Sequence, residues 1–516
     1  MAEELGRFVD HVGGPRNAYA LIDPLEQLCA VEETVVRDAA SASLRAVVAV
    51  MPEAHVAQHA APAIKRLAAA DLFPARVSAA SLFAAVHPRV PGRLRPDLRA
   101  AFARLCRDKT PMVRRAAAAH LAGLADCVEP EAVVAELLPL FLDLVQDDQD
   151  SVRLLSVEGC RGLTSLLPQS EVGAKVLPTL RALAGDKSWR VRCNVARQLV
   201  GLAEALGEAV ATRELAPLAA RLLGDAEAEV RVAAASRLSD LAVKIAPAAA
   251  REHLLPCVRG LAGDASPHVR VALAGSAMAL APVVGKDDAV GHLLPLFLDL
   301  LRDEASDVRL AVIASLEKAG GVVGPALLGQ ALLPAVRELA EDAHWRVRLA
   351  VLERVPALAR QLGAEPFQEA LGGQCLGWLE DKVASVRAAA ADVLAGLARE
   401  FGEAWGADLC GRVAALARGP HYLRRLSVLS ALVALAAAVP PEVLHGKILP
   451  AAAAAAQDRV ANVRFAAARA LADLAPRAGR PAVEATVRPC LRELLGDADF
   501  DVRYAAHVAL EACDRL

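Results

Sequence analysis

Apolar positions follow a helical period along most of the chain. Within HLLPLFLDLL, residues 292–301, the large apolar side chains recur at i, i+3, i+4, i+7 and i+8. They are Leu293, Leu296, Phe297, Leu300 and Leu301. A short turn with Asp303 follows, and a second helical pattern then runs through Val308, Val312, Leu316 and Ala319. The glycines and proline of GGVVGP, residues 320–325, end that pattern, so the stretch predicts two helices joined by a polar turn.

This two-helix pattern repeats with a spacing of 39 residues nearly everywhere, the departures being 40, 37 and 38. We align the repeats on one position near the start of each second helix, called the reference position. It is occupied by Arg37, Val77, Arg114, Arg153, Arg192, Arg231, Arg270, Arg309, Arg348, Arg387, Arg425, Arg464 and Arg503. Twelve of these thirteen residues are Arg, and the residue before is Val in eleven repeats. A fixed period of this length predicts a solenoid of stacked repeats.

An aspartate stands six residues before the reference position in eleven repeats. These residues are Asp71, Asp108, Asp147, Asp186, Asp225, Asp264, Asp303, Asp342, Asp381, Asp458 and Asp497. A carboxylate just before a helix accepts backbone N–H bonds and faces the positive end of the helix dipole. Stacked at each repeat, the aspartates and arginines are expected to form a ladder of ion pairs, which is an architectural role rather than a catalytic one.

A proline stands 14 residues before the reference position in eight repeats. These prolines are Pro139, Pro178, Pro217, Pro256, Pro295, Pro334, Pro450 and Pro489. Each falls inside the first helix and should kink it, because the ring removes a backbone donor and clashes with the previous turn. A bent first helix, a short turn and a straight second helix make a HEAT-type unit. The predicted fold is an all-α HEAT-repeat α-solenoid of stacked antiparallel helix pairs.

Aromatic residues gather three residues before the reference position. That position holds Trp189, Trp345, Tyr422 and Phe500, and prolines Pro111 and Pro267 in two further repeats. The chain has only 4 Trp, 3 Tyr and 10 Phe, so this concentration needs a reason. The position is expected in the turn, facing outward. Either each ring lies across the neighbouring turn and tightens the ridge, or it anchors a partner, beside charged contacts from Arg190, Arg346, Arg424 and Arg459.

Composition narrows the function classes. The formal net charge is −3 with 23% charged residues, so no global field attracts nucleic acid or anionic lipid. Aromatics make up only 3%, and abundant alanine suits closely packed helices. The ten cysteines form no CxxC pair, which favours a reducing compartment, the cytoplasm and also the nucleus. The start of the chain lacks a secretory pattern, and the longest apolar stretch, residues 426–441, is too short to span a membrane, so no membrane insertion is expected.

No enzyme motif is present in the sequence. It has no GxSxG, GxxxxGK[ST] or GxGxxG segment. None of the twelve histidines is followed by Glu, which argues against a helical-repeat di-iron hydroxylase. His120 and His507 are interpreted as ordinary helix residues, and the neighbours Ser239–Asp240 and Ser306–Asp307 have no histidine nearby in sequence. We therefore expect no catalytic residues, no metal and no cofactor.

Several turn segments resemble those of one known family. In chain order these are AVEETVVRD, TPMVRRAAA, QDSVRLL, DKSWRVR, EAEVR, GKDDAVGHLLPLFL, EDAHWRVRLAVLE and VANVRFAAARAL. They resemble the scaffold (A) subunits of protein phosphatase 2A from about residue 2 to the end of the chain. The resemblance implies a fifteen-repeat horseshoe without enzymatic activity. In that family the turns within the C-terminal repeats carry a Ser/Thr phosphatase catalytic subunit, and those of the N-terminal half carry one of several regulatory (B-type) subunits.

The resemblance also implies which turns bind which partner. The turns of the regulatory side correspond to Pro111, Met112, Arg115, Ser188, Trp189 and Arg190. The turns of the catalytic side correspond to His344, Trp345, Arg346, Tyr422, Arg459, Val460 and Phe500. Several of these residues, among them Trp189 and Trp345, occupy the aromatic position that the repeat pattern alone identifies.

The chain departs from the family pattern at three places. MAEELGRFVDHVGGP, residues 1–15, resembles the second helix of the family's second repeat, so the first one and a half repeats are expected to be absent. About thirteen complete repeats then follow from residue 19 to residue 516, in one solenoid. Val77 replaces the reference Arg, and Gly419 replaces the Asp.

Two other functions remain as alternatives. One is a HEAT-repeat transport or adaptor protein that binds peptides or small GTPases on its concave face. Such carriers usually present acidic inner helices, whereas the second helices here are mostly alanine and leucine. The other is a helical-repeat enzyme, which the missing ligand pairs disfavour.

Overall fold

The computed structural model describes residues 2–323 and 332–515, with side chains described for residues 2–316 and 332–515. Within these ranges the chain is helical and contains no β-strand. Its helices form two compact units, Met1–Ser276 and Ala277–Leu516. Ala319 and the GGVVGP segment, residues 320–325, fall outside the residues whose side chains are described.

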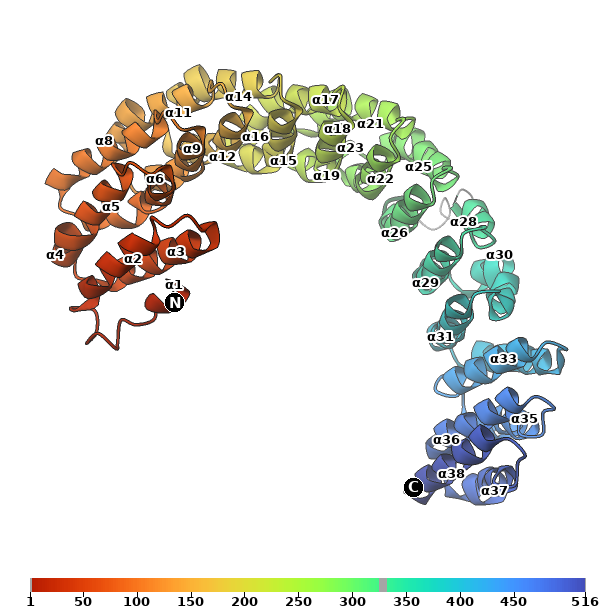
Figure 1. Cartoon of the computed structure of the whole chain (residues 1–516). Coiled ribbons are helices and arrows are strands. Elements are labelled where there is room, and N and C mark those ends of the chain that lie inside the picture. The colour runs from red at the N-terminus through yellow and green to blue at the C-terminus, as the bar shows by residue number, and fades with distance from the viewer. Residues whose placement is uncertain (1, 324–331, 516) are drawn as a thin grey trace. The chain divides into compact units, whose positions relative to one another are not determined.

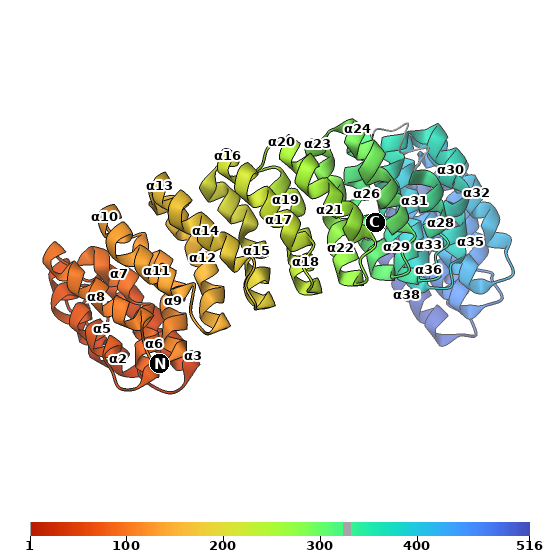
Figure 2. The ribbon, with the colours of Figure 1, turned by 90° about the horizontal axis from the view of Figure 1, so that it is seen from above.

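The second helices of successive repeats pack side by side within each unit. In the first unit α9 contacts α12, α12 contacts α15, and α15 contacts α18 (Figures 1 and 2). The second helices of this unit are α3 (Thr34–Val50), α6 (Phe73–Ala80) with α7 (Phe83–Val86), α9 (Pro111–Ala125), α12 (Asp150–Leu166), α15 (Trp189–Leu206), α18 (Ala228–Ala235) with α19 (Leu238–Ala242), and α22 (Pro267–Ser276). Those of the second unit are α26 (Ser306–Val323), α29 (Trp345–Leu362), α31 (Ala384–Phe401), α33 (Tyr422–Leu435), α36 (Ala461–Ala482) and α38 (Phe500–Asp514).

The first helices form a separate row beside the second helices (Figure 1). Among the described residues, four of them have no π-helical turn: α2 (Ile22–Leu28), α8 (Arg95–Cys106), α30 (Ala364–Gly377) and α32 (Glu403–Ala415). The others are built from short pieces joined by π-helical turns, in which backbone bonds run from residue i to i+5. Their longer pieces are α5 (Ala61–Ala68), α11 (Leu138–Leu144), α14 (Leu177–Leu183), α17 (Ala216–Leu223), α21 (Leu255–Ala262), α25 (Leu294–Leu301), α35 (Leu449–Ala455) and α37 (Arg488–Leu494). The first helix α28 (Leu333–Leu339) follows residues outside the described ranges.

The predicted kink of the first helix takes the form of a π-helical turn directly before the repeated proline. Pro139 is the second residue of α11, and the π-helical turn η5 (Val133–Leu137) precedes it. The same order recurs at η6 (Val172–Val176), η7 (Ala211–Leu215), η8 (Ala250–Leu254), η10 (Ala289–Leu293), η14 (Leu444–Ile448) and η15 (Val483–Val487). The wider turn avoids the clash between the proline ring and the preceding carbonyl. The helices α30 and α32 have Gly373 and Gly411 at this position, and neither contains a π-helical turn.

The second helices are less regular than predicted. In two repeats of the first unit the second helix breaks, between α6 and α7 and between α18 and α19. Ser236 lies at the second break, where its hydroxyl donates to the carbonyl of Val232 at 2.8 Å, a contact that bends helices. The predicted helix of residues 1–15 is also short, because only Ala2–Leu5 (α1) is α-helical before the turns around Gly13 and Gly14.

The core between repeats is built from small and branched side chains. Leu293, Phe297 and Leu301 are fully buried, as the helical pattern predicts. The valine before the reference arginine has no exposed surface in ten repeats, from Val113 to Val502. Helices approach closely where small residues meet, since a Cβ placed on Gly162 of α12 would lie only 2.7 Å from the Cβ of Ala122. Alanine and glycine therefore allow the close packing that the composition suggests.

Candidate interaction surface

The turn between the two helices of each repeat holds a bridging carboxylate. In the repeat that contains α12, the guanidinium of Arg153 donates to both oxygens of Asp186 in the next repeat, at 2.7 and 2.8 Å. Asp186 Oδ1 also accepts the backbone N–H of Ser188 at 2.8 Å. The remaining nitrogen of Arg153 donates to the carbonyl of Asp147 at 2.7 Å. We call this arrangement of arginine, aspartate and the backbone N–H two residues later a rung.

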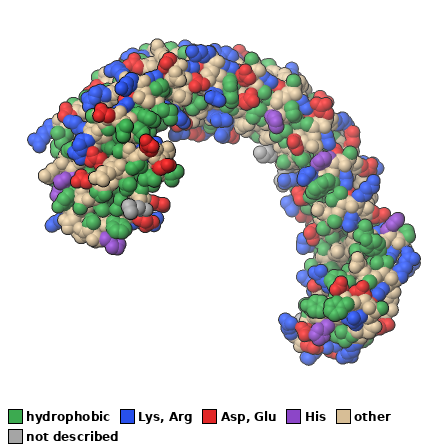
Figure 3. All heavy atoms as spheres, viewed as in Figure 1, with side chains coloured by type: hydrophobic (Ala, Val, Ile, Leu, Met, Phe, Trp, Pro, Cys, Tyr) green, Lys and Arg blue, Asp and Glu red, His purple; other side chains and the backbone are tan. Residues whose placement is uncertain are grey.

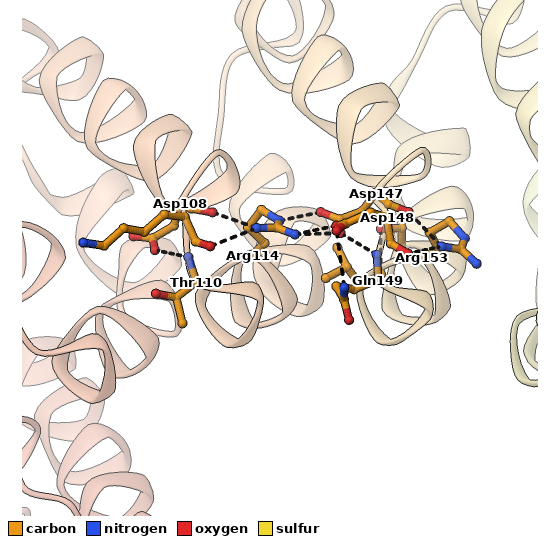
Figure 4. Close-up of polar contacts among 10 residues, drawn as sticks. Asp108, Thr110, Arg114, Asp147, Asp148, Gln149 and Arg153 are labelled. Carbon is orange, nitrogen blue, oxygen red and sulfur yellow. Dashed lines mark hydrogen bonds and ion pairs between the residues drawn. The ribbon is translucent and has the colours of Figure 1, made fainter.

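Rungs repeat through both units, which confirms the predicted ladder. Figure 4 shows the rung of Arg114 and Asp147 in the first unit. The Arg–Asp pairs, with their shortest distances, are Arg114–Asp147 at 2.5 Å, Arg192–Asp225, Arg231–Asp264 and Arg348–Asp381 at 2.7 Å, Arg309–Asp342 at 2.9 Å, and Arg425–Asp458 and Arg464–Asp497 at 2.6 Å. Each carboxylate belongs to the residue two positions before the N-cap. It caps the turn by accepting the backbone N–H of that N-cap residue. A rung therefore ties each repeat to the next and fixes the turn between its helices.

Ion pairing lowers the pKa of the carboxyls of Asp186, Asp264 and Asp497. Hydrogen bonds from Arg464 hold the pKa of Asp497 at about 2, and those from Arg231 lower the pKa of Asp264. Burial by itself would raise the pKa of Asp186, but the bonds from Arg153 and from the Ser188 N–H outweigh it, and that pKa is lowered too. The rungs are therefore fully ionised near neutral pH.

The predicted alignment is wrong by one residue in the second repeat. Arg76, rather than Val77, occupies the reference position: it donates to both oxygens of Asp108, at 2.7 and 3.1 Å, and to the carbonyl of Ala70. Asp71 is likewise displaced, because Ala70 stands where the other rungs have their aspartate. The side-chain contacts with the next repeat, which are invisible in the sequence, decide this register.

The corrected register makes the pattern more regular. All thirteen reference residues are then Arg, and the spacing is 39 except for two steps of 38. Pro62 joins the proline position and follows the π-helical turn η2 (Val56–Ala60), as in the other repeats. Phe73 joins the aromatic position, which the one-residue shift hides in the sequence. The sequence alignment is shifted by one residue here because Val77 follows Arg76, whereas in most other repeats a Val precedes the reference Arg.

The aromatic position is the first residue of each second helix, not part of the turn as predicted. Trp189, Tyr422 and Phe500 are exposed there, at 39%, 40% and 70% of their surface, and so is Phe73. Trp345 is half-buried. Arg190 lies over the ring of Trp189 at 5.8 Å and Arg346 over that of Trp345 at 4.8 Å, both measured to the ring centroid. Each pair places an aromatic ring and a guanidinium in cation–π contact at the start of a helix.

In the first unit, the residues expected to contact a regulatory subunit lie at the starts of two helices. Pro111 begins α9 and is half-buried, whereas Met112 and Arg115 are exposed. A separate turn holds Ser188, the N-cap of α15, whose hydroxyl donates to Asp150 at 2.9 Å. These turns are two repeats apart, since α12 lies between α9 and α15.

In the second unit, the residues expected to contact a catalytic subunit lie at four helix starts. His344 is the N-cap of α29, followed by Trp345 and the exposed Arg346. The other three helix starts contribute Tyr422 of α33, Arg459 and Val460 before α36, and Phe500 of α38. Of these, Arg459 is exposed and Val460 is half-buried. The residues of each predicted set therefore all lie at the starts of second helices, where Arg190 contacts Trp189 and Arg346 contacts Trp345.

Figure 3 shows basic and acidic side chains interspersed on the face it presents. Among the residues the structure describes, no cluster of three His, Cys, Asp or Glu side chains could hold a metal ion. His507 forms an exposed pair with Glu511 at 3.3 Å, one turn along its own helix.

One stretch is long and apolar enough to cross a membrane by length and composition. It is Pro267–Val284, not residues 426–441, and 56% of it is buried. It is divided among α22, the 3-10 turn η9 (Ala277–Leu280) and α23 (Ala281–Val284). Core helices of soluble proteins have the same composition, so the stretch is only a weak sign of a membrane span.

Comparison with known proteins identifies the repeat type. A family model described as PPP2R1A-like HEAT repeat matches residues 208–285, and a HEAT repeat model matches residues 176–206. Among solved structures, Kap121p bound to RanGTP has a TM-score of 0.67 at 15% identity, covering 96% of this chain and 52% of that one. Kap95p, in a structure with RanGDP, has a TM-score of 0.63 at 14% identity, covering 96% and 67%. At this identity the likeness shows the fold alone, and it confirms the predicted HEAT-repeat solenoid.

Curated relatives confirm the resemblance found in the turn segments. A protein phosphatase PP2A 65 kDa regulatory subunit of Drosophila melanogaster is 49% identical over 131 residues, which is 25% of this chain and 22% of that protein. A probable PP2A regulatory subunit of Caenorhabditis elegans is 47% identical over 137 residues, or 27% and 23%. The alpha isoform of the phosphatase 2A 65 kDa regulatory subunit of Arabidopsis thaliana is 47% identical over 138 residues, or 27% and 24%. The chain thus matches about a quarter of the length of these relatives.

Proposed function

Since the chain is a HEAT-repeat protein whose curated relatives are 65 kDa regulatory subunits of protein phosphatase 2A, we propose that it is a non-catalytic scaffold of a phosphatase 2A-type Ser/Thr phosphatase. The observation that carries the proposal is the identity of 47–49% to these relatives over 131–138 residues. The HEAT repeat is a fold of protein-binding surfaces, and a non-enzymatic role fits it.

The partners are assigned to the two predicted sets of helix starts. In the first unit, the starts of α9 and α15 bind a regulatory B-type subunit through Met112, Arg115, Trp189 and Arg190, with Pro111 and Ser188 shaping the turns. In the second unit, the starts of α29, α33, α36 and α38 bind the catalytic subunit. The residues of that second set are His344, Trp345, Arg346, Tyr422, Arg459, Val460 and Phe500. Exposed aromatic rings with a neighbouring guanidinium support these assignments, because Trp, Tyr and Arg are the residues that most often dominate protein interfaces.

The ladder supports a scaffold role in a different way. A scaffold must hold successive turns at fixed spacing so that one partner contacts several of them at once. The rungs join each turn to the next by two charge-assisted hydrogen bonds, for example between Arg348 and Asp381. The repeated arginines and aspartates therefore build the surface, and the variable helix starts provide its specificity.

Affinity purification tests the proposal. The tagged full-length chain should co-purify with a stoichiometric Ser/Thr phosphatase catalytic subunit from cells of its own source. Recovery of a small GTPase of the nuclear transport type in place of a phosphatase would instead support the transport alternative. Recovery of the phosphatase only in substoichiometric amounts, unchanged by substitution of all four aromatic residues Trp189, Trp345, Tyr422 and Phe500, would overturn the assigned surface.

A further inference from the structure

The ladder is interrupted at Gly419 in the second unit, where most rungs have aspartate; Ala70 leaves a similar interruption in the first unit. The preceding rung shows what is missing: Arg348 donates to Asp381 at 2.7 and 2.8 Å, and the same carboxylate accepts the N–H of Val383 at 2.8 Å. The following rung, Arg425 with Asp458 and the N–H of Val460, repeats this geometry. One carboxylate therefore satisfies three donors in each of these two rungs.

The arginine of the interrupted rung keeps its orientation. Arg387 Nη1 donates to the carbonyls of Asp381 and Lys382 at 2.7 and 3.2 Å. In the intact rung Arg348 makes the matching bonds to Asp342 and Ala343 at 2.7 and 3.3 Å. The Nη1 group of Arg387 is thus held by the same two carbonyl positions as that of Arg348, whose Nε and Nη2 bind the aspartate of the next repeat. Arg387 is half-buried.

Three donors consequently converge where a carboxylate is absent. Among the described residues, Nε and Nη2 of Arg387 and the backbone N–H of His421 have no acceptor. These are the counterparts of the three donors that Asp381 satisfies one repeat earlier. A guanidinium edge with a backbone N–H beside it matches the oxygens of a carboxylate or phosphate group.

A second arginine adds positive charge at the gap. Arg424 lies across Gly419, since a Cβ placed on that glycine would be 2.8 Å from Arg424 Cδ. Its Nη2 pairs with Glu380 at 3.0 Å, but its Nε is buried without a hydrogen-bond partner. Two guanidinium groups therefore face one carboxylate here, whereas each intact rung has an aspartate for its arginine. The excess charge is positive, and it favours an anion.

We propose that the gap at Gly419 is an oxyanion-binding site, in which a carboxylate or phosphate group takes the place of the absent aspartate. It binds in the plane of the Arg387 guanidinium and accepts the His421 N–H. The ligand is either free phosphate or an acidic side chain of a protein docked beside Tyr422. The second source rests on the proposed function, whereas the first is independent of it.

The backbone conformation at Gly419 permits a substitution, Gly419→Asp, that tests the site directly. Gly419 has φ −66° and ψ 151°, close to the −55° and 144° of Asp381. An aspartate is therefore compatible with this backbone, and only the flexible Arg424 side chain has to move. Gly419→Asp should restore the rung and occupy the site with a covalently attached carboxylate. Gly446→Asp is the matched control, because Gly446 is exposed in the same unit and a Cβ placed on it would have no other atom within 4 Å.

Titration of the full chain with inorganic phosphate, at constant ionic strength against chloride, tests the site. Calorimetry should detect phosphate binding to the wild type and to Gly446→Asp with equal affinity. Gly419→Asp and Arg387→Gln should each weaken it by about tenfold or more, since charge-assisted hydrogen bonds are lost. Gly419→Asp should also melt at a higher temperature than the wild type in chloride, which shows that it folds. Absence of phosphate binding to the wild type, or equal binding to Gly419→Asp, would overturn the proposal.

A second titration with purified phosphatase catalytic subunit distinguishes the two sources. If an acidic side chain of the partner fills the gap, the affinity of Gly419→Asp for the catalytic subunit should be about tenfold weaker than that of Gly446→Asp, and phosphate should compete for binding. Equal affinities of the two variants, together with phosphate binding to the wild type, support the free anion as the ligand. If the wild type itself does not bind the catalytic subunit, the proposed scaffold function fails while the phosphate result still decides the site.

Discussion

Arg231 and Asp264 lie in successive repeats and share two hydrogen bonds, at 2.7 Å from Nε and 2.9 Å from Nη2. Asp264 also accepts the backbone N–H of Ser266 at 2.9 Å. One side chain thus joins two repeats and fixes the turn that starts α22. Both side chains are largely buried, at 17% and 8% exposure, so solvent screens the pair less than it screens a surface ion pair.

Replacement of Asp264 by Ala should therefore cost more than a simple helix cap. The change leaves Nε and Nη2 of the largely buried Arg231 and the turn N–H of Ser266 without their acceptor, and we expect a loss of about 2–3 kcal/mol. Asp240→Ala is the control, because Asp240 is 57% exposed and 3.9 Å from Arg237, and it should change stability by less than about 0.5 kcal/mol. Hydrogen exchange should rise mainly in α18 and α22. A uniform rise along the whole chain would contradict the local role of the rung.

The ladder also predicts how stability depends on pH. The pKa of Asp497 is about 2 and that of Asp264 is lowered, both below the ordinary value for an unfolded chain. A depressed folded-state pKa contributes stability that is fully present above the unfolded value, near pH 4, and is lost as the pH falls toward 2. Denaturant unfolding at constant ionic strength should show this loss between about pH 4 and pH 2. Asp497→Asn should flatten part of the profile, and an unchanged free energy of unfolding between about pH 5 and pH 2.5 would refute the assignment.

The register of the second repeat is open to a direct test. Arg76 is 7% exposed and bridges to Asp108, so Arg76→Ala should destabilise the chain by about 2–3 kcal/mol. Asp71 is exposed and lies outside the ladder, so Asp71→Ala should stay within about 0.5 kcal/mol. Thermal unfolding of the two variants measures the difference. The reverse ranking would restore the alignment on Val77 and Asp71.

Close helix packing should make one glycine sensitive to a single methyl group. A Cβ on Gly162 would lie 2.7 Å from the Cβ of Ala122, so Gly162→Ala should cost about 1–3 kcal/mol through overpacking. Gly260→Ala in α21 is the control, since that position is exposed and open, and the better helix former should stabilise the chain by up to about 1 kcal/mol. Chemical denaturation of both variants gives the comparison, and equal effects would mean that the α9–α12 contact adjusts freely.

The two tryptophans of the aromatic position should separate the two binding surfaces. Trp345→Ala should weaken catalytic-subunit binding by about 2 kcal/mol, roughly thirtyfold, and Trp189→Ala should leave it unchanged. Trp189→Ala should weaken the binding of a regulatory subunit instead. Because Trp345 is half-buried and Trp189 is exposed, Trp345→Ala should also lower the melting temperature more. Titrations with each purified subunit check the pair, and equal affinities for the wild type and both variants would remove the aromatic position from the mechanism.

Much of this architecture can be predicted from the sequence, because it depends on short local patterns that recur in many repeats. Helical periods such as that of Leu293, Phe297 and Leu301 depend on neighbours three or four residues apart, so they are visible in the chain itself. The Asp and Arg positions recur in phase, which is enough to predict the ladder without coordinates. The proline position predicts a kink, although not its form as a π-helical turn.

Features that depend on contacts between repeats could be determined only from the tertiary structure. Arg76 rather than Val77 is the reference residue because its guanidinium meets Asp108, 32 residues away, and no local pattern distinguishes the two. Trp189 and Trp345 have similar sequence contexts, DKSWRVR and DAHWRVR, but Trp189 is exposed and Trp345 is half-buried. Gly419 departs from the aspartate pattern in sequence, but only the structure shows that Nε and Nη2 of Arg387 and the His421 N–H are left without an acceptor among the described residues. Local sequence fixes each helix pair, whereas side chains about 30 or more residues apart meet only after the repeats have stacked.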